Sequence, residues 1–97
     1  MLRITTTDQS DVLVLAMEGR LCGAWAGEAR GAWLKLRAAA NGHPIILELA
    51  GVSFVDAAGE QLLAEILSAG ARVHSSGVLI SHIVERLRND VHVHRLK

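Results

Sequence analysis

The sequence predicts a single α/β domain, in which a sheet of mainly parallel strands packs with about three helices. Short runs of β-branched and aliphatic residues alternate along the chain with segments whose apolar residues recur every three or four positions. The 97 residues suit one domain, and neither a linker nor an internal repeat divides them. We therefore expect one domain over residues 1–97, with the element order β-β-α-β-α-β-α-β.

The first two strands are predicted to form a hairpin. Leu2–Thr6 and Val12–Met17 are rich in β-forming residues, and the polar segment between them, TTDQSD, favours a turn. Gly19 is expected to end the second strand. The hairpin would place one antiparallel strand at the edge of an otherwise parallel sheet.

Helical spacing follows the hairpin. Apolar residues fall mostly three or four positions apart, at Trp25, Ala29, Ala32, Trp33, Leu36 and Ala40. This pattern predicts a helix whose inner face carries both tryptophans. The segment NGHP ends the helix, because Gly42 fits a left-handed cap and Pro44 disfavours helix at His43. Ile45–Leu49 is then predicted to be a buried strand.

The second half of the chain predicts two more helices and two more strands. A helix should begin within one or two residues of Gly59, and Ala71–His74 should form a short strand before a third helix. Asn89 and Asp90 are expected to break that helix, and Val91–His94 to form the last strand. The residues expected to face the core are Leu62, Leu63, Ile66 and Leu67 in the second helix, and Leu79, Ile80, Ile83, Val84 and Leu87 in the third.

Composition excludes several classes of function. The 10 basic and 10 acidic residues give a net charge of zero, so the chain has no electrostatic footprint for nucleic acid or an anionic membrane. No apolar run has the length of a signal peptide or approaches the ~20 residues of a membrane span. Cys22 is the only cysteine and can form neither an internal disulfide nor a cysteine metal cluster. We expect a cytoplasmic protein without direct membrane insertion.

Two loops at the carboxyl ends of the strands form the predicted functional site, because sites in such sheets lie where loops leave those ends. They are Arg20–Gly23, after the second strand, and Val52–Ala58, after the third, and we call them together the rim. If the two strands are neighbours, Arg20, Cys22 and Asp56 converge there.

Three segments carry a resemblance to a known family. They are MEGRL at residues 17–21, VSFVDAAG at residues 52–59 and GARVH at residues 70–74. Together they resemble the STAS domain, the module shared by sulfate transporters and bacterial anti-sigma factor antagonists, over about Ile4 to Val93. The resemblance implies a stand-alone STAS-like domain that acts as a regulatory interaction module.

The resemblance also implies side chains that this chain lacks. It would put a phosphorylatable hydroxyl at Ala57, a second small hydroxyl at Ala58 and an acid at Cys22. Neither alanine can accept phosphate. We therefore expect partner binding without phosphorylation at Ala57.

Residues of the rim also have structural interpretations. Asp56 can cap the first N–H groups of the helix that follows it, and Gly59 can allow close backbone packing. Cys22 can be a partly buried small side chain, with Arg20 as its only evident activator.

The sequence contains no recognisable catalytic or complete metal-binding arrangement. It shows no Ser-His-Asp or Cys-His set, no paired carboxylates across a cleft and no glycine-rich phosphate loop before a helix. His92 and His94 have a spacing that can serve zinc or nickel, with a third ligand needed from His74, His82 or an acid elsewhere; without one the pair is an ordinary solvated strand face. We expect a protein that is not an enzyme and that carries no metal and no cofactor.

The resemblance indicates two kinds of protein partner. The first is an anti-sigma factor of the kinase-like ATP-binding class; the alternative is the ATPase of a bacterial phospholipid ABC transporter, with this chain as a STAS-like accessory subunit. Family members commonly have a helix after the final strand, so an end at Lys97 would leave that strand uncovered and favour a homodimer. The residues expected to bind the partner are Arg20, Cys22, Asp56, Ala57, Ala58, Gly59, Glu60 and Gln61.

Overall fold

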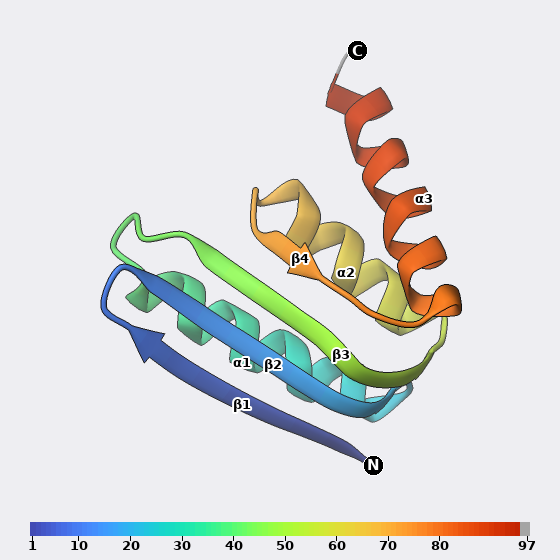
Figure 1. Ribbon diagram of the computed structural model, residues 1–97, viewed down its shortest axis with the longest axis horizontal. Helices are drawn as coiled ribbons and strands as arrows, with labels where there is room; N and C mark the ends of the chain where they lie inside the picture. Colours follow the sequence, from blue (N-terminus) through green and yellow to red (C-terminus); the bar gives the residue numbers. More distant parts are fainter. Residues whose placement is uncertain (96–97) are drawn as a thin grey trace.

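Four strands form one mixed sheet in the computed structural model, which describes residues 1–95 (Figure 1). They are β1 (Leu2–Gln9), β2 (Val12–Leu21), β3 (Ile45–Val55) and β4 (Arg72–His74). The strands lie in the order β1-β2-β3-β4. β1 pairs antiparallel with β2, whereas β2, β3 and β4 run parallel.

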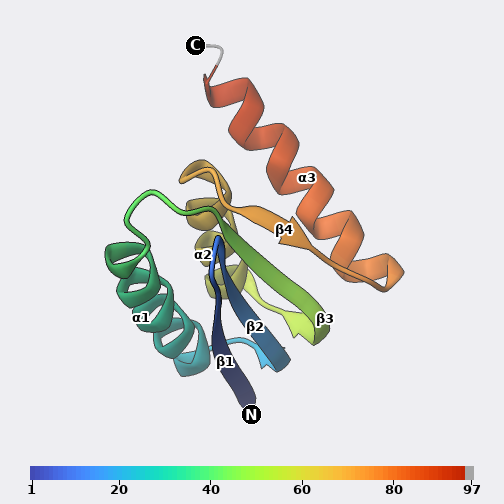
Figure 2. The same ribbon diagram turned by 60° about the vertical axis from the view of Figure 1, so that its left-hand side comes forward.

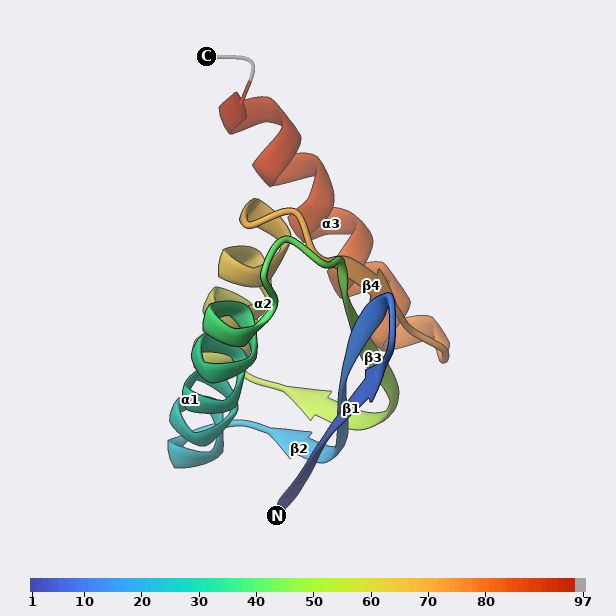
Figure 3. The ribbon, with the colours of Figure 1, turned by 90° about the vertical axis from the view of Figure 1, so that its left-hand side faces the viewer.

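Three helices complete the described part of the chain. They are α1 (Ala24–Ala39), α2 (Ala57–Ser68) and α3 (Val78–Arg95). α1 and α2 lie on the same face of the sheet (Figure 3). α3 lies beyond β4 and packs against α2 and β3 (Figure 2). The predicted α/β class is confirmed, with the observed order β-β-α-β-α-β-α.

The core lies between the sheet and the two helices on its face. Side chains alternate between this face and the opposite one along most of β2 and along β3 as far as Leu49, as strand geometry requires. Beyond Leu49 the pairing of β3 with β2 shifts register, and the next buried residues are Val52 and Val55. The largest fully buried side chains are Trp33, Leu15, Met17, Leu21, Leu47, Leu49, Leu63 and Ile66. These side chains come from β2, β3, α1 and α2. Their packing therefore holds β2 and β3 under the two helices and fixes where the carboxyl ends of these strands meet.

The predicted inner faces of α2 and α3 are confirmed with one exception. The buried residues are Leu62, Leu63, Ile66 and Leu67 in α2, and Ile80, Ile83, Val84 and Leu87 in α3. Leu79 is 61% exposed. It precedes the buried Ile80, and neighbouring residues of a helix point about 100° apart. Within residues 1–95, no helix combines the length and the apolar character that crossing a bilayer requires.

Only one of the two tryptophans packs in the core. Trp33 is 1% exposed, whereas Trp25 is 40% exposed, so the expected inner position of Trp25 is wrong. Eight residues of helix rotate about 80° beyond two full turns, so the two side chains leave α1 in different directions.

Both strands that lead to the rim are longer than predicted. β2 passes through Gly19 and ends at Leu21, and β3 continues to Val55. Gly19 does not end β2, because glycine tolerates the φ of 108° found there, where a Cβ would meet the carbonyl oxygen of Met1. The third strand therefore reaches the rim directly, and Asp56 alone separates it from α2.

The predicted last strand is wrong. α3 continues through Asn89 and Asp90 to Arg95, so the segment expected as a strand at Val91–His94 is helical. Asn and Asp lower helix propensity by less than about 0.7 kcal/mol each, which does not stop an established helix. The expectation of a homodimer through an uncovered final strand loses its basis with it. The side chains of residues 91–97 lie outside the part that the structure describes, and with them the metal-binding interpretation of His92 and His94.

Candidate functional site

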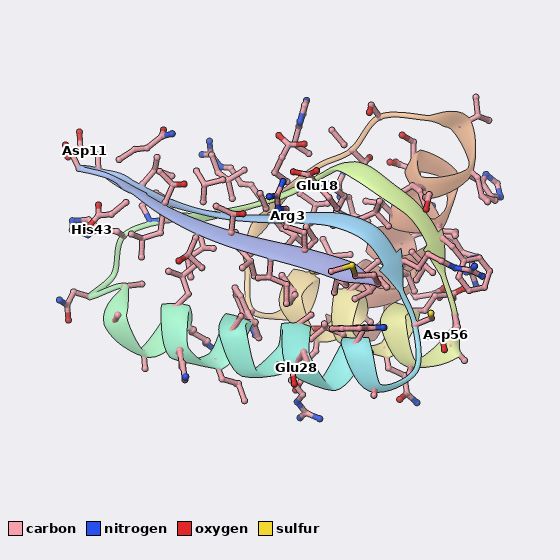
Figure 4. The ribbon with its side chains drawn as sticks, turned by 90° about the horizontal axis from the view of Figure 1, so that it is seen from below. Arg3, Asp11, Glu18, Glu28, His43 and Asp56 are labelled. Carbon is pink, nitrogen blue, oxygen red and sulfur yellow. The ribbon has the colours of Figure 1, made fainter. Side chains whose placement is uncertain are left out.

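Asp56 joins the two halves of the rim. Its Oδ1 accepts a hydrogen bond from the Gly59 N–H, and its Oδ2 accepts one from the Gly23 N–H, each at 2.9 Å. The Asp56 N–H donates to the Leu21 carbonyl at 3.3 Å. Figure 4 shows Asp56 at the end of the sheet opposite His43. The predicted capping of α2 is confirmed, and the same carboxylate also holds the β2–α1 connection.

The hydrogen bonds explain the ionisation of this carboxyl. The N–H of Gly23 and then that of Gly59 hold the pKa of Asp56 below its usual value, because both donate to the charged form. The group is a carboxylate at neutral pH and can only accept hydrogen bonds. Two of its acceptor positions are already occupied by backbone, which makes Asp56 a structural clamp between the loops.

Gly59 is required by the close approach of α2 to the end of β2. A Cβ at this position would meet the carbonyl oxygen of Leu21 and would lie 2.8 Å from Cγ1 of Val55. The predicted role of Gly59 in close backbone packing is confirmed. Gly59 is buried, and its close contact with Leu21 and Val55 sets the position of the first turn of α2.

The ends of β2 and β3 bring the other predicted residues together. Leu21 pairs with Val55, and Arg20 pairs with Phe54. The Arg20 guanidinium lies over the Phe54 ring, 4.9 Å from its centroid. Cys22 is half-buried in the link to α1. Arg20 is thus on the rim, where its guanidinium covers an aromatic ring of the neighbouring strand.

The first turn of α2 presents small and polar side chains to solvent. Ala57, Ala58 and Gln61 are exposed. Glu60 is partly buried and accepts a hydrogen bond from Arg86 of α3 at 2.6 Å. The Glu60 carboxylate therefore already holds α3 against α2, and a partner that contacts it must share it with Arg86.

A shallow hollow of about 370 Å³ lies beside this turn. It is lined by Val55, Asp56, Ala57, Glu60, Gln61, Ala64 and Leu87. The hollow extends from Asp56 on the rim along α2 to Leu87 of α3. Among the side chains of residues 1–90, no three of His, Cys, Asp or Glu gather where they could hold a metal ion.

The roles of three residues at or near the rim were not predicted, although two of them, Gly23 and Phe54, lie within the predicted rim segments. Gly23 acts through its backbone N–H, which no side-chain pattern reveals. Phe54 is 39% exposed, and the alternation of a strand does place it on the face opposite Val55. Arg86 is distant in sequence from Glu60, so their ion pair depends on how α2 and α3 pack.

Comparison with known proteins gives one family match. The model of the STAS domain matches residues 3–82. A crystal structure of Mglu matches with a TM-score of 0.59 and 24% identity, over 76% of this chain and 19% of that chain. A crystal structure of Mglu in its glutamate form gives a TM-score of 0.40 and 21% identity, over 74% of this chain and 26% of that chain.

These structural matches are limited in extent. The chain spans about a fifth of the length of the first Mglu structure, which supports the fold alone. No curated protein matches the chain.

Proposed function

The chain belongs to the STAS domain family, and on that basis we propose that it binds a protein partner through the rim and the exposed first turn of α2. STAS domains are generally regulatory modules that commonly mediate protein–protein interactions. The proposed contact residues are Arg20, Cys22, Asp56, Ala57, Ala58, Glu60 and Gln61, with Gly59 beneath them.

The clamp made by Asp56 is the observation that carries this proposal. Its carboxylate binds Gly23 and Gly59 at 2.9 Å each, so both loops are held in one arrangement before any partner arrives. A surface fixed in this way loses little conformational entropy on binding. The exposed methyl groups of Ala57 and Ala58 add no long side chains that would have to be ordered.

The same surface would bind without phosphorylation. A phosphoryl group brings close to two negative charges into a contact and can abolish it. Ala57 and Ala58 have no hydroxyl that could accept that group. Control of binding then lies with the partner or with the abundance of this chain, and no chemistry on the rim is required.

An anti-sigma factor of the kinase-like ATP-binding class is the first candidate partner. The support is the family resemblance together with a rim that keeps the Asp56 clamp and the exposed start of α2. A partner of this class is cytoplasmic, so the proposal places the chain in the cytoplasm.

The ATPase of a phospholipid ABC transporter is the second candidate. A structural subunit of such a transporter needs a docking surface and no phosphate acceptor, and the two alanines favour that role.

Calorimetric titration against both purified candidates tests the proposal. We expect saturable binding to the anti-sigma factor with the same Kd in the presence and absence of ATP, and an unchanged mass of this chain after incubation. Phosphate on residues 52–68 would contradict the absence of a switch. Binding to the transporter ATPase alone would select the second candidate, and binding to neither would overturn both.

A further inference from the structure

β1 and α1 together line a groove of about 720 Å³. Both elements lie away from α3 (Figure 2). The α1 wall consists largely of residues with little or no side chain, and β1 supplies an apolar and a hydroxyl side chain. The small residues of this wall include Ala24, Gly27, Gly31 and Ala39 of α1, and the two β1 side chains are Ile4 and Thr6. A helix or strand could therefore approach α1 closely from this side.

β1 is a free edge of the sheet. Within residues 1–95 it pairs with β2 alone, so its outward N–H and C=O groups have no strand partner. The residues at its centre, Thr5–Thr7, are exposed and uncharged. Arg3 and Asp8 lie near its two ends, carry opposite charges and point to opposite faces of the strand, so the edge carries no net charge that would repel an identical strand.

α1 carries a self-complementary pattern of charges. Glu28 and Lys35 both line the groove, and two turns of helix separate them on one face. Neither side chain forms an ion pair within the described residues. In an antiparallel pair of α1 helices centred between Gly31 and Ala32, Glu28 of each copy faces Lys35 of the other.

One two-fold axis can serve both elements. β1 and α1 run side by side in the same direction, as Figure 4 shows from the β1 edge, where Glu28 is labelled on α1. Their lengths are similar, since 8 strand residues span about 26 Å and 16 helical residues about 24 Å. The midpoint of β1, at Thr5 and Thr6, therefore lies beside the midpoint of α1.

We propose that a second copy of this chain occupies the groove, in a symmetric dimer that pairs β1 with β1 and α1 with α1. The two four-stranded sheets then become one continuous sheet without a free β1 edge. α1 contacts both β1 and β2, and strands lie about 4.8 Å apart. The two α1 helices would consequently lie on the order of 10 Å apart, which is the distance at which helices pack.

The dimer does not rest on the proposed partner. α2 and α3 lie on the β3 and β4 side of the molecule, away from the β1 edge, so their surfaces remain open in both copies (Figure 1). A dimer would present two rims to a partner, and loss of the dimer would leave each rim intact.

Sedimentation velocity of the wild type and of charge-reversed variants tests the dimer. The wild type should show a monomer–dimer equilibrium between about 1 µM and about 1 mM. Glu28→Lys and Lys35→Glu should each raise the dimer dissociation constant at least about tenfold, because each sets like charges against one another. An equimolar mixture of the two variants should recover the dimer, since the two mutant chains are then complementary.

Matched controls are available on α3. Glu85→Lys and Arg88→Glu make the same changes of net charge at exposed positions far from the groove, and they should leave the equilibrium unchanged. A wild type that stays monomeric over the whole range would overturn the dimer. So would single variants that dimerise as the wild type does, or a mixture that stays monomeric while far-UV circular dichroism shows folded chains.

Discussion

Replacing Gly59 with alanine tests whether the first turn of α2 is held against the end of β2. The added methyl would meet the Leu21 carbonyl oxygen and would lie 2.8 Å from Cγ1 of Val55. A carbonyl in a paired strand cannot rotate away, so α2 must retreat. That retreat also pulls Asp56 from its hydrogen bonds with Gly23 and Gly59.

The size of the effect follows from two opposing contributions. Forcing an extra methyl group into a packed site costs about 1–3 kcal/mol, and the rigid neighbour here points to the upper half of that range. Alanine gains about 0.8–1 kcal/mol over glycine within a helix. We therefore expect Gly59→Ala to lower the free energy of unfolding by roughly 1–2 kcal/mol.

Urea unfolding monitored by far-UV circular dichroism measures this difference, and Gly27→Ala in α1 is the matched control. A Cβ at Gly27 has no heavy atom of the same chain within 4 Å, so in the monomer, at a protein concentration below the dimer dissociation constant, only the helical preference remains and the control should gain roughly 0.5–1 kcal/mol. If Gly59→Ala stabilised the protein as Gly27→Ala does, the close contact between α2 and Leu21 would be refuted.

Three further substitutions have expected outcomes. Asp56→Asn should lower the Tm at neutral pH, because the lowered pKa of this carboxyl stabilises the fold above the unfolded pKa of about 3.9; the gap should close as the pH falls through the folded pKa, and a constant gap down to acid pH would argue against the clamp. Arg86→Ala should cost less than about 1 kcal/mol in urea unfolding, because its pair with Glu60 is partly exposed, and the loss should shrink at high salt; a loss independent of salt would point to packing instead. Trp33→Ala should cost about 3–5 kcal/mol and Trp25→Ala no more than about 1 kcal/mol in the same assay, and equal losses would contradict their different burial.

Much of the fold follows from periodicity in the sequence. The alternating runs of β2 and β3 and the apolar spacing of α2 place the right residues in the core, because burial dominates the choice of face. Periodicity fails where the local pattern is ambiguous. The Val91–His94 segment alternates as a strand would, yet it continues an existing helix, and extending a helix is easier than nucleating a new element.

The rim was predictable in position and only partly in detail. The capping role of Asp56 and the packing role of Gly59 follow from local residue chemistry just before and within a helix. The second hydrogen bond of Asp56, to Gly23, depends on how two connections distant in sequence meet. The ion pair of Glu60 with Arg86 depends in the same way on the packing of α3.

The affinity of the partner for Ala58→Glu tests the proposed docking surface most directly. An acidic residue in the first turn of a helix is favourable for folding, so a loss of binding would report the contact itself. Ala69→Glu places the same charge at the opposite end of α2, at another exposed position. We expect Ala58→Glu to raise the Kd at least about tenfold while Ala69→Glu leaves it unchanged. Equal affinities for the wild type and a folded Ala58→Glu variant would contradict a partner contact at the rim.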